Sequence, residues 1–324
     1  MFLDLRAVNF SKFKIKHRDR SAQVPFELNP SQTLVIDRLM EQALNGLPMW
    51  AIILKARRVG ISTECSFLNV IHCTAFQNAV AMSVAHRAKN VRAMFRDARA
   101  GHTTLCYDCR FDPEQLRTAH ELRFPHEDEQ DSLYSIATAK TVEGARGLTV
   151  TALHLSEAAF YEQSQDAFTA LISTVAYRPD TMILIESTAN GKVGPGETFY
   201  EYWVEAVEGK NQFTPIFISW MMDPVSRMDP EVNNVLSSNL DAEEQELVEV
   251  HGADFEQISW RRWAIPNRCQ GYVDKFHQEY PTTPEEAFVS TGDPAFLPGE
   301  MKAAESTLRK PKFMGSVEIP RPAE

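Results

Sequence analysis

Short apolar, β-branched runs alternate with stretches of helical periodicity between Trp50 and Trp220. This alternation predicts an α/β fold, with right-handed crossovers and a mostly parallel sheet that helices cover on both faces. In such a sheet, ligands bind at the carboxyl ends of the strands. The predicted strands span residues 50–54, 79–85, 133–137, 151–155, 182–186 and 215–220, and the predicted helices span 32–43, 64–76, 88–100, 163–175 and 198–208.

The chain changes character after Trp220. A loop is followed by an acidic helix predicted over 241–251, by a segment rich in Trp and Arg, and by a region punctuated with proline. We expect a core domain over residues 1–230 that includes an N-terminal arm, a small C-terminal lid subdomain over 231–310, and a linker over 311–324.

The formal net charge of −11 argues against a protein whose whole surface binds nucleic acid. A basic run near the N-terminus is compatible with a solvated arm, which we favour, or with a DNA contact. The sequence has no apolar run long enough to cross a bilayer and no signal-peptide core, so we expect a cytoplasmic protein without a membrane partner. The basic run consists of Lys12, Lys14, Lys16, Arg18 and Arg20.

The five cysteines are odd in number and favour reduced thiols over a disulfide framework. Cys106 and Cys109, with His120 and His126 downstream, approach the spacing of a zinc finger, and His102 is an equally placed alternative ligand. The residues between them lack the core pattern of a finger. Reduced cysteines outside the sheet are therefore the favoured interpretation.

The loop after the first predicted strand, KARRVGIST, has the features of a phosphate-binding loop whose lysine is displaced. In the frame G-x-x-x-x-G-K-[ST], the second glycine and the Mg²⁺-binding hydroxyl are in place, but Ile61 occupies the lysine position. Backbone N–H groups at the helix N-terminus can bind phosphate, and three cations precede them. A chance match is the alternative. The candidate nucleotide-binding residues are Lys55, Arg57, Arg58, Gly60, Ser62 and Thr63.

The predicted strand over 151–155 ends in Ser156 and Glu157, within TALHLSEAAF. An apolar strand that ends in two polar residues is typical of a Walker B motif, where the first acid holds Mg²⁺ and the second activates the attacking water. Ser156 can orient a metal-bound water without contributing charge, and Glu157 is the candidate general base. The alternative is a helix N-cap in which Ser156 is the cap.

Three further motifs fit a nucleotide site. Residues 187–190, in ESTANG, follow a buried strand and can sense the γ-phosphate, although an ordinary turn is the alternative. Gln32, upstream of the first strand, can bind the adenine edge because its amide has an acceptor and donors. Arg146, in EGARG, is a candidate arginine finger, with a surface arginine as the alternative. The candidate coupling residues are Ser187, Thr188 and Asn190.

With these motifs in this order, the chain resembles the ATPase half of the large terminase subunit of tailed bacteriophages, the motor that packages viral DNA. The resemblance covers nearly the whole chain. The most distinctive motif is EYPTTPEEAF followed by GDPAF, because no requirement of NTPase chemistry accounts for it. The other motifs are FELNPSQ, the lysine-shifted KARRVGIST, AVAMSVAHRAKNVRAMF, EGARG, LHLSEAAF, and ESTANG with TFYEYW.

The resemblance implies a RecA-like P-loop NTPase fold of the ASCE type and hydrolysis of ATP with Mg²⁺. It implies Gln32 at the adenine, the residues of KARRVGIST around the phosphates, Glu157 as catalytic base, and the ESTANG residues as the coupling motif. Arg146 becomes a finger offered to a neighbouring subunit. Ser156 departs from the more usual aspartate, and whether Lys55 or Arg57 is the main γ-phosphate contact stays open.

The family also implies partners: double-stranded DNA, the portal protein, the small terminase subunit and further copies of the chain in a ring. We expect a location in the host cytoplasm, docked on the procapsid portal during packaging, and not in the mature virion.

The family's nuclease domain would begin about where this sequence ends, so we expect an isolated ATPase domain without nuclease activity. The alternatives are a helicase-like DNA-dependent ATPase and a non-catalytic nucleotide-binding or scaffold protein with decayed Walker motifs.

Overall fold

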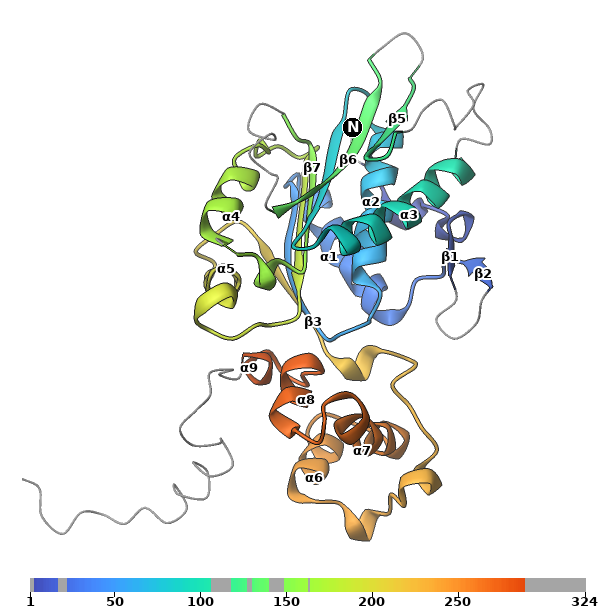
Figure 1. Cartoon of the computed structure of the whole chain (residues 1–324), viewed down its shortest axis with the longest axis vertical. Helices are drawn as coiled ribbons and strands as arrows, with labels where there is room; N and C mark the ends of the chain where they lie inside the picture. Colours follow the sequence, from blue (N-terminus) through green and yellow to red (C-terminus); the bar gives the residue numbers. More distant parts are fainter. Residues whose placement is uncertain are drawn as a thin grey trace, which may run out of the picture. The chain divides into compact units, whose positions relative to one another are not determined.

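The computed structural model describes residues 3–16, 22–105, 118–126, 130–139, 149–162 and 164–288. Seven strands form a sheet in the order β5-β6-β4-β7-β8-β3-β9, and every neighbouring pair is parallel except β5 with β6 (Figure 1). All six predicted strands are present, and β5 is an unpredicted edge strand. The strands are β3 (Met49–Lys55), β4 (Val80–Ala85), β5 (Glu121–Phe124), β6 (Ser132–Thr138), β7 (Ala152–Ser156), β8 (Met182–Ser187) and β9 (Thr214–Ile218).

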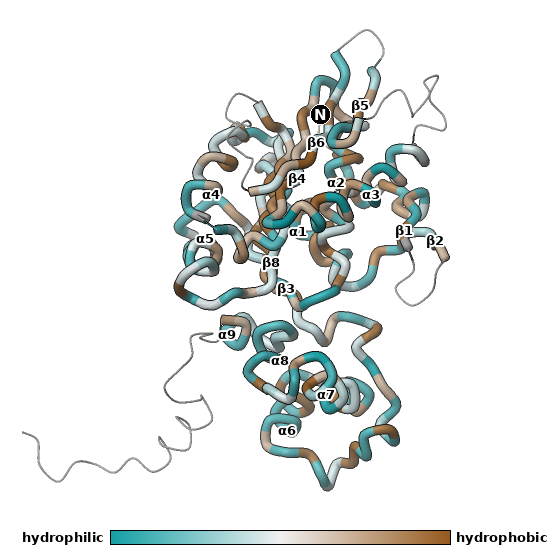
Figure 2. The backbone as a smooth tube through the Cα atoms, viewed as in Figure 1, coloured by the Kyte–Doolittle hydropathy of each residue, from teal (hydrophilic) through white to brown (hydrophobic). Residues whose placement is uncertain are grey.

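Helices cover both faces of the sheet, which confirms the predicted α/β architecture (Figure 1). One face packs against α1 (Pro30–Leu44), α2 (Ile61–Ala75) and α3 (Ala88–Leu105), and the other packs against α4 (Ser164–Ile172) and α5 (Glu197–Val207). Strand β3 is buried along its whole length. Its alternate side chains enter the two hydrophobic clusters, as expected of a central parallel strand, and the apolar colour in Figure 2 follows these strands.

The N-terminal residues form a docked element instead of the free arm that the basic run suggested. Strands β1 (Lys14–Lys16) and β2 (Gln23–Pro25) pair antiparallel. Just before β1, the buried ring of Phe13 packs 4.4 Å from the ring of Phe67 in α2. A side chain at Gly101 in α3 would collide with Phe13, so the glycine makes room for this aromatic contact. Arg18 and Arg20 lie outside the described residues.

The chain after β9 is helical. Helices α6 (Ala242–Glu249), α7 (Phe255–Arg268), α8 (Val273–Glu279) and α9 (Pro284–Ala287) follow several short 3-10 turns. Trp220, at the end of the β9 segment, stacks on Trp260 of α7 with ring centroids 5.2 Å apart. Both rings belong to the same hydrophobic cluster as α1 to α3. The predicted boundaries at residues 230 and 310 stay predictions, and the linker over 311–324 lies outside the described residues.

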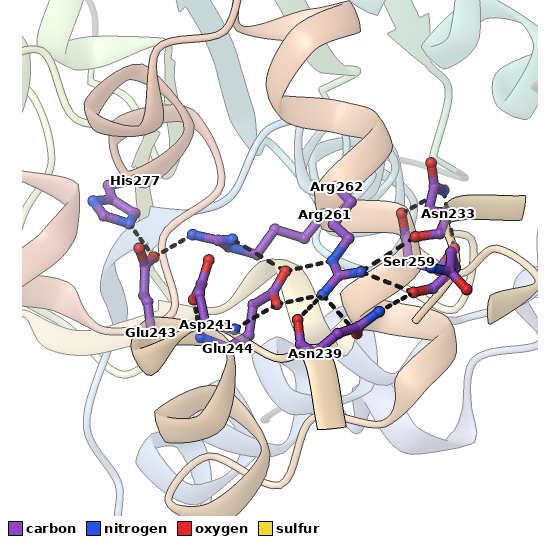
Figure 3. A network of polar contacts seen from close by, with 10 residues as sticks. Asn233, Asn239, Asp241, Glu243, Glu244, Ser259, Arg261, Arg262 and His277 are labelled. Carbon is purple, nitrogen blue, oxygen red and sulfur yellow. Dashed lines mark hydrogen bonds and ion pairs between the residues drawn. The ribbon is translucent and has the colours of Figure 1, made fainter. Parts of the chain in front are cut away.

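A network of ion pairs joins α6, α7 and α8 (Figure 3). Arg262 donates two 2.7 Å hydrogen bonds to the carboxylate of Glu244, whose pKa is lowered by this pairing in spite of burial. Arg261 pairs with Glu243, and His277 lies 2.7 Å from the same carboxylate. Paired charges of this kind tolerate burial because each carboxylate has a cationic partner.

Within the described residues, no helix combines the length and the apolar character that crossing a membrane requires.

Candidate nucleotide site

The loops that follow β3, β7 and β8 open on the same edge of the sheet, as predicted, because these strands are parallel neighbours. They line a pocket of about 560 Å³. Ser62 and Glu157 contribute to its wall, and Thr188 does so from the loop after β8. Thr63 also lines this pocket, as do His86 and Arg87 from the loop before α3, which the sequence did not single out. The pocket is the candidate site for a nucleotide.

The phosphate-loop match depends on an unusual backbone at Gly60, which has φ +85° and precedes α2. The conformation favours glycine, and a Cβ at this position would lie 2.8 Å from Nε2 of Gln32, so the amide of Gln32 would have to shift. Arg58 also has positive φ, at 66°. The chain therefore turns tightly before the helix N-terminus, as a phosphate-binding loop must.

Gln32 lies against this loop, and both ends of its amide have protein partners. Its Nε2 donates to the carbonyl of Gly60 at 3.0 Å, and its Oε1 accepts from the backbone of Asn29 in the capping box of α1. Asn29 also donates to the carbonyl of Val59 at 3.1 Å. The observed contacts make Gln32 a support of the loop, and an adenine contact stays a prediction.

Lys55 is the buried cation of the loop. Its Nζ lies 3.1 Å from Oε2 of Glu186 in β8, and the side chain is only 5% exposed. Burial would lower the pKa of Lys55, but the negative charge of Glu186, aided by Glu157, raises it above its usual value. Lys55 is therefore held charged at the carboxyl end of β3, where the loop begins.

Glu186 was not among the predicted site residues, yet it contacts more of them than any other side chain that we describe at this edge. Its Oε1 accepts a 2.7 Å hydrogen bond from Oγ of Ser62 and lies 3.3 Å from Nε2 of His154. Burial would raise the pKa of Glu186, but Lys55 and His154 outweigh it and lower the pKa to about 2. Glu186 is a charged carboxylate at the centre of the loop's polar contacts.

A chain of polar side chains continues from Glu186 across the sheet. His154 of β7 lies 3.2 Å from Oγ of Ser83 in β4, which lies 2.8 Å from the hydroxyl of Tyr134 in β6. Asn69 of α2 donates to the same serine at 3.1 Å. With Lys55 of β3, which pairs with Glu186, the chain takes one polar side chain from each of five adjacent strands. Each contact holds the orientation of the next side chain.

The other two loop cations point elsewhere. Arg57 donates 2.8 Å hydrogen bonds to both carboxylate oxygens of Glu279, and its backbone N–H donates to the Glu279 carbonyl. Arg58 lines a second pocket of about 410 Å³ together with Arg57, Arg268 and Lys275. Arg57 also lines the larger pocket, whereas Lys55 is buried against Glu186. The structure therefore separates Lys55 from the two arginines that the sequence placed beside it.

Glu157 has the geometry of a functional residue rather than of a helix cap. It adopts φ 56°, in the left-handed region, and makes no side-chain cap hydrogen bond to the short helix η5 (Ala158–Phe160). The alternative of an N-cap box is wrong. Burial raises the pKa of Glu157, while Lys55 opposes this shift. Among the residues described, its carboxylate has no hydrogen-bond partner and faces the pocket. Positive φ at a non-glycine residue is strained and marks functional sites.

The predicted coupling residues bond to the segment that follows Glu157. Ser187 accepts a 3.1 Å hydrogen bond from the backbone N–H of Ala159, and Asn190 donates to the carbonyl of the same residue at 3.1 Å. Thr188 lines the pocket between these contacts. The loop after β8 is therefore built against the loop after β7, beyond what an ordinary turn requires.

Other predicted residues are not brought to the site. Arg146 lies outside the described residues, as do Cys106 and Cys109. His126 lies within hydrogen-bond distance of the Cys73 carbonyl and the Ser132 hydroxyl. In the part of the chain that the structure describes, no group of three or more His, Cys, Asp or Glu side chains could hold a metal ion. Ser156 is buried beside its register partner Glu186, and its metal role stays a prediction.

No family model and no curated protein matches this sequence. Solved structures do. The large terminase of bacteriophage HK97 matches with a TM-score of 0.53 and 14% identity, over 87% of this chain and 55% of that one. The large terminase ATPase domain of Thermus phage P74-26 matches with a TM-score of 0.47 and 16% identity, over 81% of this chain and 100% of that one.

The large terminase of a thermophilic bacteriophage, in complex with ADP, matches with a TM-score of 0.43 and 13% identity, over 71% of this chain and 52% of that one. The chain thus spans about half the length of the HK97 protein and of this ADP-bound protein. The likeness to the HK97 protein concerns the fold. The chain has the RecA-like α/β fold of the phage large terminases.

Proposed function

We propose that this chain is the ATPase part of a viral DNA-packaging motor, in which hydrolysis of ATP drives double-stranded DNA into a procapsid. One observation carries the proposal. Ser62 in the first turn of α2, Glu157 after β7 and Thr188 after β8 line one pocket at the carboxyl edge of the sheet, and Glu186 joins Ser62 to the charged Lys55. These are the side chains that phosphoryl transfer needs: a metal-binding hydroxyl, a base, a γ-phosphate contact and a cation.

The residues of the pocket fit Mg²⁺. This ion takes oxygen ligands and usually combines one or two protein groups with the phosphates and water. Ser62 donates its hydroxyl proton to Glu186, so its lone pairs remain for a cation. When bound, the metal would neutralise the charge that develops on the phosphates. Lys55 is already charged and would exchange Glu186 for a phosphate oxygen.

Glu157 would accept the proton of the attacking water. Its carboxylate faces the pocket without a hydrogen-bond partner among the described residues, so it is available to a water molecule. Burial raises its pKa, which makes it a stronger base than an ordinary carboxylate. Glu157 lies directly after β7, adopts positive φ and lines the pocket.

Loss of the γ-phosphate would be transmitted by the contacts around Thr188. Ser187 and Asn190 bind the segment after Glu157. Gln278, at the end of α8, donates to the carbonyl of Ala189 at 3.1 Å. A shift of this loop would therefore reach both the catalytic segment and the helical region, which is the property that a motor needs.

The partners that follow from the proposal are double-stranded DNA, a portal protein, a small terminase subunit and further copies of this chain in a ring. The setting is the host cytoplasm at the procapsid portal. The fold shared with the HK97 large terminase supports this assignment. In the ring, Arg146 would serve as the finger for a neighbouring subunit's ATP.

The test is an ATPase assay on the wild type and on Glu157→Gln, with and without double-stranded DNA and over a range of protein concentrations. The variant should bind ATP as the wild type does but lose turnover by at least about 100-fold. Glu201→Gln, at an exposed position of α5, is the matched control.

Near-normal turnover in Glu157→Gln would remove Glu157 as the base. Nucleotide binding without turnover in the wild type, under every condition, would favour a non-catalytic protein. Turnover that rises more than linearly with protein concentration would support a finger supplied by another subunit.

A further inference from the structure

We infer that Glu186 is the carboxylate that positions the Mg²⁺ ligand, acting through Ser62 in place of the acid that is missing at Ser156. The inference rests on the proposed ATPase function. In P-loop NTPases, the metal is held by the loop hydroxyl together with an acid at the end of the Walker B strand. Here that strand ends in Ser156, and Glu157 faces the pocket for a different task.

The hydrogen bond between Ser62 and Glu186 has a defined direction. The Ser62 hydroxyl donates to Oε1 of Glu186 at 2.7 Å, so its single proton points toward the carboxylate. The lone pairs of the Ser62 oxygen then point away from Glu186. Since Ser62 lines the pocket, the bond fixes this hydroxyl as a ligand for a cation.

Glu186 also occupies the same position along the strand direction as the missing Walker B acid would. Ser156 of β7 and Glu186 of β8 are register partners on adjacent parallel strands. Moving the carboxylate from position 156 to position 186 therefore shifts it sideways by one strand, without a shift along the strand direction. In this register Ser156 lies beside Glu186, with a hydroxyl where the Walker B strand would carry its acid.

The two oxygens of Glu186 have separate partners. Oε2 faces Lys55, which accounts for charge neutralisation in the buried site. Oε1 faces Ser62 and His154. A carboxylate that served only as the counter-ion of Lys55 would not need the Oε1 contacts with Ser62 and His154. The chain from His154 through Ser83 to Tyr134 fixes the orientation of the carboxylate, as second-layer partners do at metal sites.

The experiment measures the affinity of a fluorescent ADP analogue twice, in Mg²⁺ and in EDTA, for the wild type and its variants. The ratio of the two affinities reports metal positioning, because a loss of folding or of Lys55 contacts changes both values together. In Glu186→Gln, the ratio of the affinity in Mg²⁺ to the affinity in EDTA should fall by about 10- to 100-fold relative to the wild type. The affinity in EDTA itself should not change. Ser156→Ala, the rival assignment, should keep the ratio.

Two further variants guard against misfolding. Glu186→Asp keeps the buried charge opposite Lys55 but cannot reach Ser62, so it should also lose most of the ratio. Adding Ser156→Asp to Glu186→Gln returns a carboxylate to the Walker B position and should restore the ratio. A full ratio in both Glu186 variants, or its loss in Ser156→Ala alone, would overturn the inference. Absence of nucleotide binding in the wild type would instead overturn the proposed function itself.

Discussion

Arg57 and Glu279 bind each other through both backbone and side chain, although they are 222 residues apart in the sequence. Arg57 lies in the loop after β3 and Glu279 ends α8. The neighbouring Gln278 donates to the carbonyl of Ala189, after β8. The end of α8 therefore contacts two loops of the candidate nucleotide site at once.

Arg57→Ala should loosen the end of α8. The Arg57 side chain is 57% exposed, so solvent screens the pair and its loss should cost no more than about 1 kcal/mol. Amide hydrogen exchange over residues 273–288 should therefore accelerate by up to about fivefold, with global stability nearly unchanged. Hydrogen exchange read by mass spectrometry measures this directly.

Arg58→Ala is the matched control for that experiment, because Arg58 is the next residue in the loop and carries the same charge, whereas the bonds to Glu279 come from Arg57. It should leave exchange in residues 273–288 as in the wild type. Equal acceleration in both variants would mean that net charge in the loop, and not the Arg57–Glu279 contact, orders α8.

Lys55→Met should destabilise the fold strongly, because it leaves the buried carboxylate of Glu186 without its cation. Removing one partner of a buried ion pair costs about 3–5 kcal/mol, and we expect the lower end since Ser62 and His154 still bind Glu186. Urea denaturation without nucleotide gives the free energy of unfolding.

The double variant Lys55→Met/Glu186→Gln should recover part of that loss, because a neutral amide is less costly to bury than an unpaired charge. Its free energy of unfolding should lie between those of the single variant and the wild type. If the double variant were less stable than Lys55→Met alone, the ion pair would not be the reason for the destabilisation.

Much of the fold could be predicted from sequence, and the reason is local. Strand β3 is buried on both faces and so forms a continuous apolar run, and the helices carry their own periodicity. The N-terminal hairpin was missed because its docking depends on Phe13 meeting Phe67 and Gly101 of two distant helices. No local pattern encodes that contact.

The candidate site could be predicted only in part, because local sequence patterns locate its loops but do not show which side chains meet in the folded sheet. Its loops follow apolar strands, so their positions could be inferred, but the partners of each side chain could not. Glu186 gains its importance from β3 and β7, which flank β8 only in the folded sheet. The one available signal was an acid and a histidine, Glu186 and His154, inside strands that are otherwise apolar. Buried ionisable residues of that kind need partners.

Gly60→Ala should cost more stability than the same change at a glycine with open space around it. Positive φ alone costs an alanine about 1–2 kcal/mol. At Gly60 the new Cβ would also lie 2.8 Å from Gln32 Nε2, and at Gly46, which has φ +70°, nothing lies within 4 Å. We expect about 1 kcal/mol for Gly46→Ala and at least about 2 kcal/mol for Gly60→Ala, from urea unfolding.

Equal losses in the two alanine variants would show that Gln32 yields without cost and that only backbone conformation requires Gly60. Combining Gly60→Ala with Gln32→Ala tests the steric part separately. The two losses should sum to more than the loss in the double variant, since the shorter side chain removes the collision.

The pair formed by His277 and Glu243 should make the stability of the helical region depend on pH. Burial lowers the pKa of His277, but the bond to Glu243, with Glu286 nearby, raises it above 6.5 overall, although Arg261 opposes this. Its stabilising contribution is therefore complete below about pH 6.5 and is lost as the pH rises through the folded pKa. Burial would raise the pKa of Glu243, but His277 and Arg261 lower it to about 2, so its contribution is lost only as the pH falls below 4.5.

The destabilisation caused by His277→Gln should thus be largest between about pH 4.5 and 6.5 and should shrink as the pH rises through the raised pKa of His277, where the wild type loses the charge. Because Glu243 is 39% exposed, the shift in Tm should be small, about 2 °C or less. Differential scanning calorimetry at about pH 5.5 and 8 measures it, with His251→Gln, just after α6, as the control. A difference in Tm that is constant across this range, or that grows with pH, would mean that packing of the ring, and not its charge, joins α8 to α6.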